Sequence, residues 1–281
     1  MNSACTSTCG TRRPAGTCVR HSNAAAASHS SATAILTLAL RIAVVSDIHA
    51  NFHAFEAALA AVDAERPDAI WCLGDLVGYG PRPNECCALA RQRADVCLAG
   101  NHDLAVLGAL DLEEFSGDAG AAVRWTREVI DDASRGYLAR LRSDGESDGI
   151  GLFHGSPRDP VWEYVLTEAA AAGSFRAAPQ PLLLVGHSHV ALALTELRSG
   201  VAGGLAPDGA EVDLSSGRWL LNPGSIGQPR DGDPRAAFLL LDLDARWARF
   251  RRVQYAVERT QAEIRERGLP ELLADRLARG E

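Results

Sequence analysis

Short apolar runs alternate with amphipathic stretches through the first two thirds of the chain. Residues 42–45 are apolar without polar alternation, which is typical of a strand buried on both faces. Apolar residues at helical spacing then run from Phe52 to Val62 and predict an amphipathic helix that ends near Arg66. The recurring pattern predicts strands at residues 41–45, 68–73, 96–99, 150–153 and 182–185. The predicted helices are 52–66, 84–93, 116–132, 137–142 and 163–172, with Asn84 as a cap.

The pattern changes after residue 190. Short apolar runs separated by Gly, Pro and Asp are typical of antiparallel strands. These strands are predicted at residues 190–197, 211–214, 218–221, 236–242 and 246–253, and polar helices at 256–267 and 270–279. The whole pattern predicts an α/β (α+β) fold, a four-layer αββα sandwich of two mixed β-sheets flanked by helices.

The N-terminal segment has a different composition. Residues 1–33 are rich in Ser, Thr, Ala and Asn without an apolar period, so we interpret them as a disordered tail ahead of one domain at 34–281. The apolar run 34–40 continues through Arg41 without a small-residue cleavage site, which argues against a secretion signal. No stretch of 18 uncharged apolar residues occurs, so we expect no membrane span.

Charge and cysteine content narrow the choice of partner and compartment. A net charge of −8 with a pI near 5.5 argues against a long nucleic acid as ligand. A small phosphorylated substrate remains compatible, because bound metal supplies positive charge locally. The seven cysteines do not form an even disulfide framework, and the spacing of Cys5, Cys9, Cys18 and His21 fits no standard zinc site. We therefore expect a reducing, cytoplasmic setting.

Each of the five early strands is followed by side chains that commonly bind metal. A glycine precedes the first of them in three cases, which allows a tight bend and a close approach of the backbone. Each motif alone is weak evidence, but five consecutive strand ends with such residues indicate one shared metal site. The residues are Asp47 and His49, Asp75, Asn101 and His102, His154, and His187 and His189.

The order Asp-x-His, Gly-Asp, Gly-Asn-His-Asp, His, Gly-His-x-His resembles the calcineurin-like metallophosphoesterase superfamily over residues 41–255. The later segment Asn222-Pro223-Gly224-Ser225, with Gln228-Pro229-Arg230-Asp231, is similar to its branch of small bacterial and archaeal phosphodiesterases. The resemblance implies a β-sandwich flanked by helices, in agreement with the pattern above.

The resemblance also implies the roles of the residues. Two divalent transition-metal ions would be bound, with Mn²⁺ expected and Fe, Zn, Ni or Co also suited to these donors. Hydroxide activated by the metals would attack phosphorus. His102 would contact the phosphate or protonate the leaving group, and Asp103 would hold the His102 ring in the useful tautomer. Asp47, His49 and His189 would hold the first ion, Asn101, His154 and His187 the second, and Asp75 would bridge them.

One departure from the family pattern argues against two of the activities found in the superfamily. Related protein phosphatases and dinucleoside tetraphosphatases continue the second motif with Asp-Arg-Gly, whereas Asp75 is followed here by Leu76 and Val77. The phosphate-binding arginine is therefore missing from that position, although Arg82 or Arg158 could approach from a neighbouring loop.

We expect a phosphoesterase that acts on small phosphodiesters. A phosphomonoesterase or nucleotidase with the same site remains an alternative. A further alternative is a catalytically silent protein-binding scaffold, but such a scaffold would not need the complete set of metal ligands. The segment 199–216 is expected to border the substrate, and 143–149 to be a surface loop.

Overall fold

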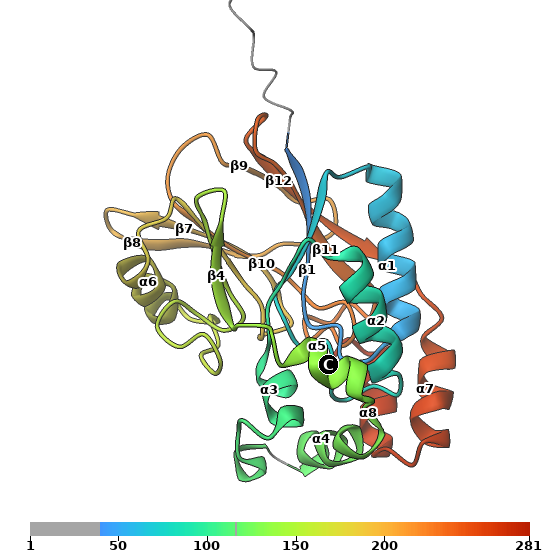
Figure 1. Ribbon diagram of the computed structural model, residues 1–281. Coiled ribbons are helices and arrows are strands. Elements are labelled where there is room, and N and C mark those ends of the chain that lie inside the picture. Colours follow the sequence, from blue (N-terminus) through green and yellow to red (C-terminus); the bar gives the residue numbers. More distant parts are fainter. Residues whose placement is uncertain (1–39, 116) are drawn as a thin grey trace, which may run out of the picture. The chain divides into compact units, whose positions relative to one another are not determined.

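The computed structural model of the protein describes residues 40–115 and 117–281 (Figure 1). The predicted tail of residues 1–33 lies outside the described residues. Among the described residues, no helix is long and apolar enough to cross a membrane.

The first of two sheets has the strand order β3-β2-β1-β11-β12-β9. Its central strand β1 pairs in parallel with β2 and antiparallel with β11, so the sheet is mixed. The strands are β1 (Arg41–Val45), β2 (Ala69–Cys72), β3 (Val96–Cys97), β9 (Glu211–Asp213), β11 (Ala236–Asp242) and β12 (Trp247–Val253).

The second sheet has the strand order β4-β5-β6-β10-β7-β8 and is also mixed. Here β5 and β6 are parallel, and β10 is parallel to β6 but antiparallel to β7. The strands are β4 (Asp144–Ser147), β5 (Ile150–Phe153), β6 (Leu182–Val185), β7 (Ala191–Leu197), β8 (Gly200–Leu205) and β10 (Trp219–Pro223).

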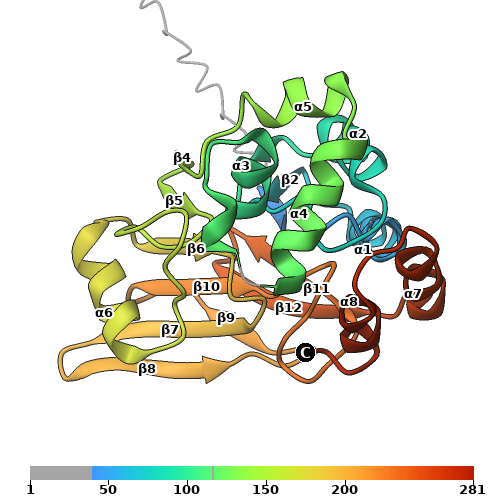
Figure 2. The ribbon, with the colours of Figure 1, turned by 90° about the horizontal axis from the view of Figure 1, so that it is seen from below.

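Helices cover the outer faces of both sheets (Figures 1 and 2). The first sheet packs against α1 (Phe52–Glu65) and α2 (Pro83–Arg93), and the second against α6 (Glu168–Ala177). The remaining helices are α3 (Asn101–Leu107), α4 (Gly117–Val129), α5 (Asp132–Leu138), α7 (Val257–Glu266) and α8 (Glu271–Asp275), with 3₁₀ turns at Leu112–Glu114 and Arg276–Ala278. The predicted four-layer αββα sandwich of two mixed sheets is confirmed.

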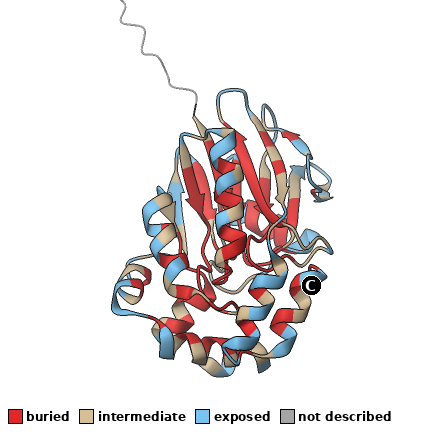
Figure 3. Cartoon of the chain, turned by 90° about the vertical axis from the view of Figure 1, so that its right-hand side faces the viewer, coloured by how far each residue is buried: buried red, intermediate tan, exposed pale blue. Residues whose placement is uncertain are grey.

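Strand β11 is covered on both faces, which explains why its sequence is apolar without alternation. Phe238 and Leu240 lie in the core under the helices, whereas Leu239 and Leu241 lie in the core between the sheets. Successive side chains point to opposite faces of a strand, so a strand covered on both faces requires apolar residues throughout. Figure 3 shows the resulting burial along the strands and the inner sides of the helices.

Two predicted helix starts are wrong: a Thr side chain caps one helix later in the chain, and a Pro begins the other without a side-chain cap. The helix expected at 163–172 begins at Glu168, where the Thr167 side chain accepts a hydrogen bond from the Ala170 amide. Asn84 lies inside α2, which begins at Pro83, and its side chain instead bridges to the backbone of Val129 and Asp131.

Three further predictions differ from the structure: one concerns a strand, one a helix and one the segment 199–216. The expected loop 143–149 contains β4, which pairs antiparallel with β5. The helix expected at 137–142 is α5, which ends at Leu138. The segment 199–216 contains β8 and β9, which belong to different sheets, and none of its residues lines the hollow at the metal-type side chains.

Candidate metal centre

The metal-type side chains follow the carboxyl ends of strands that lie side by side. Backbone hydrogen bonds continue past the strands, from the Asp47 amide to the Gly74 carbonyl (3.0 Å) and from the Gly186 amide to the His154 carbonyl (2.8 Å). Parallel strands end at the same edge of a sheet, so residues distant in sequence meet there.

Five of these residues have left-handed backbone conformations. Such conformations are uncommon for residues other than glycine and occur where the surrounding structure enforces them, often at functional sites. The φ angles are 54° at Asp47, 48° at His49, 54° at Asp75, 63° at His187 and 60° at His189. The chain thus turns sharply at each strand end and directs these side chains inward.

Two positions require glycine, because atoms of neighbouring loops lie too close to leave room for a Cβ atom. A Cβ atom on Gly100 would lie 2.0 Å from Asp75 Oδ1, and one on Gly186 would lie 2.3 Å from Ser46 Oγ. Any larger residue would displace the loops that carry the metal-type side chains.

The first group of donors comprises Asp47, His49, Asp75 and His189, whose nearest donor atoms lie within 4.8 Å of one another. His49 Nδ1 lies 3.1 Å from the Val77 carbonyl, and His189 Nδ1 lies 2.6 Å from the Gln228 carbonyl. A carbonyl only accepts, so both Nδ1 atoms carry the proton and both Nε2 atoms present lone pairs.

These two lone-pair nitrogens face each other. His49 Nε2 and His189 Nε2 are 3.0 Å apart, and His189 Nε2 lies 3.4 Å from Asp47 Oδ1. Burial lowers the pKa of both histidines well below its ordinary value, so neither ring gains a second proton near neutral pH. Acceptors held this close fit a cation between them.

The second group comprises Asp75, His154 and His187. His154 Nδ1 lies 2.9 Å from the Leu73 carbonyl, and its Nε2 lies 3.1 Å from Asn101 Oδ1. His187 Nε2 lies 3.2 Å from the Trp162 carbonyl, which leaves Nδ1 as its lone-pair atom. Burial lowers the pKa of His187 to about 2, so this ring is also neutral.

Asp75 belongs to both groups. Its Oδ1 accepts a hydrogen bond from the His102 amide (2.9 Å). Its Oδ2 is buried without a hydrogen-bond partner among the described residues and lies 3.5 Å from both His49 Nε2 and His154 Nε2. An orphaned carboxylate oxygen between two sets of nitrogen donors fits a shared ligand of two divalent cations.

A loop from the end of β10 braces the two groups. Asn222 Nδ2 donates to the Gly186 carbonyl (2.7 Å) and to Ser188 Oγ (3.0 Å). Ser225 Oγ donates to the Asp47 carbonyl (2.7 Å). The segment Asn222–Ser225 therefore fixes the loops that carry the donors, without supplying a donor itself.

His102 and Asp103 do not interact as expected. The Asp103 carboxylate accepts hydrogen bonds from the backbone amides of Leu76, Val77 and Gly100. His102 Nδ1 is buried and has no partner among the described residues. The expected orientation of the His102 ring by Asp103 is wrong, because the three amides occupy the carboxylate and fix the loop after β2.

The arginine at this site is Arg230. The two arginines considered from sequence are bound elsewhere, Arg82 to Glu263 and Arg158 to Glu163. Arg230 Nη2 instead lies 2.9 Å from Gln228 Oε1 and 3.3 Å from the Tyr79 hydroxyl. It follows Gln228-Pro229 directly, and this position after the last metal-type motif was the only sequence signal.

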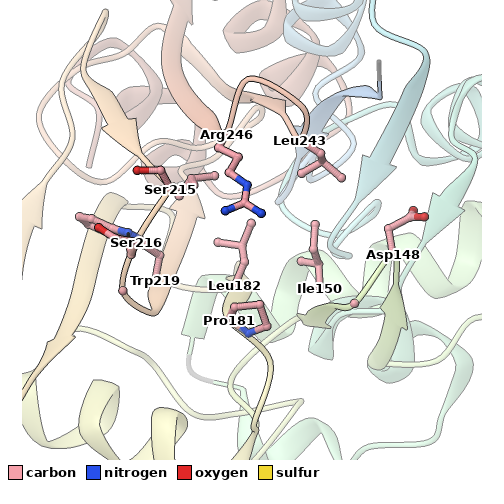
Figure 4. A pocket seen from close by; sticks show the side chains of 12 residues that line it. Asp148, Ile150, Pro181, Leu182, Ser215, Ser216, Trp219, Leu243 and Arg246 are labelled. Carbon is pink, nitrogen blue, oxygen red and sulfur yellow. Dashed lines mark hydrogen bonds between the residues drawn. The ribbon is translucent and has the colours of Figure 1, made fainter. Parts of the chain in front are cut away.

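Four of the donors, Asp75, Asn101, His187 and His189, line a hollow of about 110 Å³. Its wall also includes His102, Tyr79, Trp162, Tyr164 and Arg230. A separate hollow of about 410 Å³ opens where β5, β6 and β10 begin, at the other ends of the strands. Arg246 points into this second hollow, between Leu182 and Ser215 (Figure 4). None of the metal-type residues lines it, so the chemistry belongs to the smaller hollow.

Comparison with known proteins agrees with this geometry. Residues 40–246 match the model of the calcineurin-like phosphoesterase superfamily domain. An uncharacterised protein of Methanocaldococcus jannaschii is 35% identical over 245 residues, which cover 85% of this chain and 98% of that protein. The protein belongs to the calcineurin-like phosphoesterase superfamily.

Solved structures show the same fold. A metallophosphoesterase from Sphaerobacter thermophilus is 45% identical with a TM-score of 0.79, and the match covers 86% of this chain and 100% of that one. A hypothetical protein from Pyrococcus horikoshii is 23% identical with a TM-score of 0.69, over 86% of this chain and 99% of that one. The resemblance seen in the sequence motifs is thus confirmed at the level of the superfamily.

Proposed function

We propose that this protein is a dimetal-dependent phosphodiesterase that hydrolyses small phosphodiesters. The observation that carries the proposal is the orphaned Asp75 Oδ2, which lies 3.5 Å from a histidine nitrogen of each donor group. Asp47, His49 and His189 would hold one ion, Asn101, His154 and His187 the other, and Asp75 both. When bound, two such ions supply a nucleophilic water at neutral pH and offset the charge on the phosphoryl oxygens.

Arg230 is assigned to the phosphoryl group. It lines the same hollow as the donors, and no Asp or Glu side chain among the described residues lies within ion-pair distance of it. The neighbouring Asp231 is occupied by Arg252 in a buried ion pair. A guanidinium without a carboxylate partner is suited to bind a nonbridging phosphoryl oxygen.

His102 is assigned to the leaving group. Its ring lies 4.9 Å from the ring of His49 and 4.4 Å from that of Tyr79, measured between centroids. Burial lowers the pKa of His102 to about 3, so the ring is neutral and retains one proton to donate. This N–H would donate a hydrogen bond to the departing oxygen. The anionic phosphoryl group of a bound substrate favours a second proton on the ring, and that proton would pass to the alkoxide and leave the ring neutral, while Asp103 would contribute by holding the loop after β2.

The donor set favours Mn²⁺ over Mg²⁺. Four of the seven donors are imidazoles, which Mg²⁺ accepts poorly and which Mn, Fe, Co, Ni and Zn accept well. The diester preference is supported by the resemblance to the small phosphodiesterase branch. A reducing, cytoplasmic location is supported by the free Cys72, Cys86, Cys87 and Cys97 among the described residues.

Hydrolysis of bis(p-nitrophenyl) phosphate and of p-nitrophenyl phosphate by metal-stripped and reloaded protein tests the proposal. Stripped protein should release nitrophenol at the rate of buffer alone, and Mn²⁺ should restore diester hydrolysis at least as well as Mg²⁺. Faster hydrolysis of the monoester would establish the phosphomonoesterase alternative. Full activity in Mg²⁺ alone would overturn the choice of metal, and no hydrolysis with any metal would overturn the enzyme.

A further inference from the structure

A third hollow, also of about 410 Å³, adjoins the metal centre and is separate from the hollow that contains Arg246. It shares Tyr79, Tyr164 and Arg230 with the hollow that contains the metal-type donors. Its remaining wall includes Asp118 at the start of α4, Leu272 in α8 and Arg276 just after α8. The two hollows are contiguous, so a substrate whose phosphate reaches the donors extends into this space.

Arg276 gives this hollow a second positive charge. Its Nε donates to a main-chain carboxylate oxygen of Glu281, the last residue of this sequence, and no Asp or Glu side chain among residues 40–115 and 117–281 lies within ion-pair distance of its guanidinium. Burial, together with the nearby charge of Arg230, lowers the pKa of Arg276, yet a guanidinium remains charged. Two arginines that face one cavity repel each other unless an anion lies between them.

Arg230 is the more enclosed of the two. Its Nε is buried without a hydrogen-bond partner among the described residues. Its guanidinium carbon lies 5.6 Å from the centre of the Tyr79 ring, and its Nη2 contacts only uncharged oxygens. A buried donor left without a partner is costly, and a bound anion would satisfy it.

The acidic side chains near the hollow do not neutralise the positive charges of both arginines. Asp118 lines the hollow with Arg276, and no ion pair joins them in the described part of the chain. Glu114 lies at the edge of the smaller hollow and is exposed. Two guanidinium groups and the Asp118 carboxylate therefore line the hollow, while the Glu281 terminal carboxylate contacts Arg276 and leaves Arg230 without an anionic partner among the described residues.

We propose that this hollow binds the part of the substrate beyond the scissile phosphate and selects phosphodiesters that carry a second phosphoryl group. The inference rests on the proposed phosphodiesterase function. Arg230 lies between the two hollows and binds the scissile phosphoryl group, whereas Arg276 binds the second one. Tyr164, which is 46% exposed, provides an aromatic surface for the connecting group.

Two matched chromogenic diesters test the inference, thymidine 5′-(p-nitrophenyl phosphate) and the same compound with a 3′-phosphate. Manganese-loaded protein should show a kcat/KM about 10- to 100-fold higher for the 3′-phosphorylated compound, the range for a charged hydrogen bond. Arg276→Ala should remove this preference and change hydrolysis of the unphosphorylated compound by less than about twofold, since Arg276 does not touch the scissile phosphate. Arg276→Lys should keep part of the preference.

The matched control is Arg279→Ala, which removes an exposed arginine paired with Glu281 and outside the hollow. It should leave the preference unchanged. Equal rates for the two diesters in the unmodified protein, or an equal loss for both in Arg276→Ala, would overturn the inference.

Calorimetric binding separates this inference from the proposed function. Thymidine 3′,5′-bisphosphate should bind the manganese-loaded protein more tightly than thymidine 5′-monophosphate, and Arg276→Ala should abolish the difference. If the protein hydrolyses neither diester, the proposed function fails, while a difference abolished by Arg276→Ala still supports the anion site. Equal affinity for the two nucleotides overturns the anion site whatever the activity.

Discussion

The two halves of the metal centre share Asp75 but differ in how they are enclosed. His49 and His189 in the first half are held by the carbonyls of Val77 and Gln228 and are buried, and of the two only His189 lines the hollow. In the second half, His187 is held by the carbonyl of Trp162 and is covered by Tyr164, whose ring stacks on it at 4.1 Å.

The difference lies in the elements that supply each half. Loops at the ends of packed strands fix the first half, and the segment Asn222–Ser225 braces them. The second half depends on the connection between β5 and α6, where Tyr164 is 46% exposed. Less enclosure means that local opening costs less, so we expect the second ion to bind more weakly than the first.

Replacement of the shared carboxylate should have the largest effect, because it affects both halves. Asp75→Asn removes the negative charge that offsets the repulsion between two cations, so kcat should fall to the level of metal-stripped protein. Elemental analysis should find fewer than about one metal per chain. Asp213→Asn, at an exposed position in β9, is the control and should retain both metals. Two metals per chain in Asp75→Asn would contradict the bridging role.

Histidine replacement in each half should separate the two ions. His187→Ala should keep close to one metal per chain, because the four donors of the first group remain intact. His49→Ala should lose the ion of the more enclosed half. The ion that remains should then bind with the weaker Mn²⁺ affinity of the second half. Titration with Mn²⁺ followed by elemental analysis measures both. Equal residual affinity in the two variants would mean that the halves do not differ.

His102→Ala should lose activity without losing metal. The expected fall in kcat is about 10²–10⁴-fold, the usual effect of removing an acid–base group. If the ring protonates the departing alkoxide, the loss should be smaller for nitrophenyl esters, whose leaving group needs no proton. Metal content and kcat for alkyl and nitrophenyl diesters are the measurements. A variant that contains only one metal would show that His102 is itself a ligand.

The smallest effect is expected at Tyr164, which covers only the second half. Tyr164→Ala removes the ring stacked on His187 and should weaken binding of the second ion by about 10-fold, the lower range for residues that support a ligand. The kcat at saturating Mn²⁺ and saturating substrate should stay within about threefold of the original, because the ring faces the part of the substrate beyond the scissile phosphate and not the reacting atoms. Tyr164→Phe keeps the stacked ring and should behave like the unmodified protein. If the phenylalanine variant also loses affinity, the hydroxyl rather than the ring supports the site.

Most of the strands and the positions of the metal-type residues were readable from the sequence, whereas β4 and β8 were not. Both follow from local rules, since a strand covered on both faces is apolar throughout and its functional residues lie just past its end. Residues 41–45, 150–153 and 182–185 were therefore assigned with the bounds that the structure has. The family motif supplied the division of these donors between two ions.

Only the tertiary structure decided which partners these residues have. Arg82 and Arg158 were the arginines considered from the sequence, but they meet glutamates that lie 181 and 5 residues away in the chain, and Arg230 lines the hollow instead. Asp103 meets three backbone amides instead of the neighbouring His102 ring. Most of these contacts join segments far apart in sequence, and the nearby pairs depend on how their loops fold, so an apolar pattern does not encode them. The position of Asp75 Oδ2 between two donor groups is the product of four strand ends packed together.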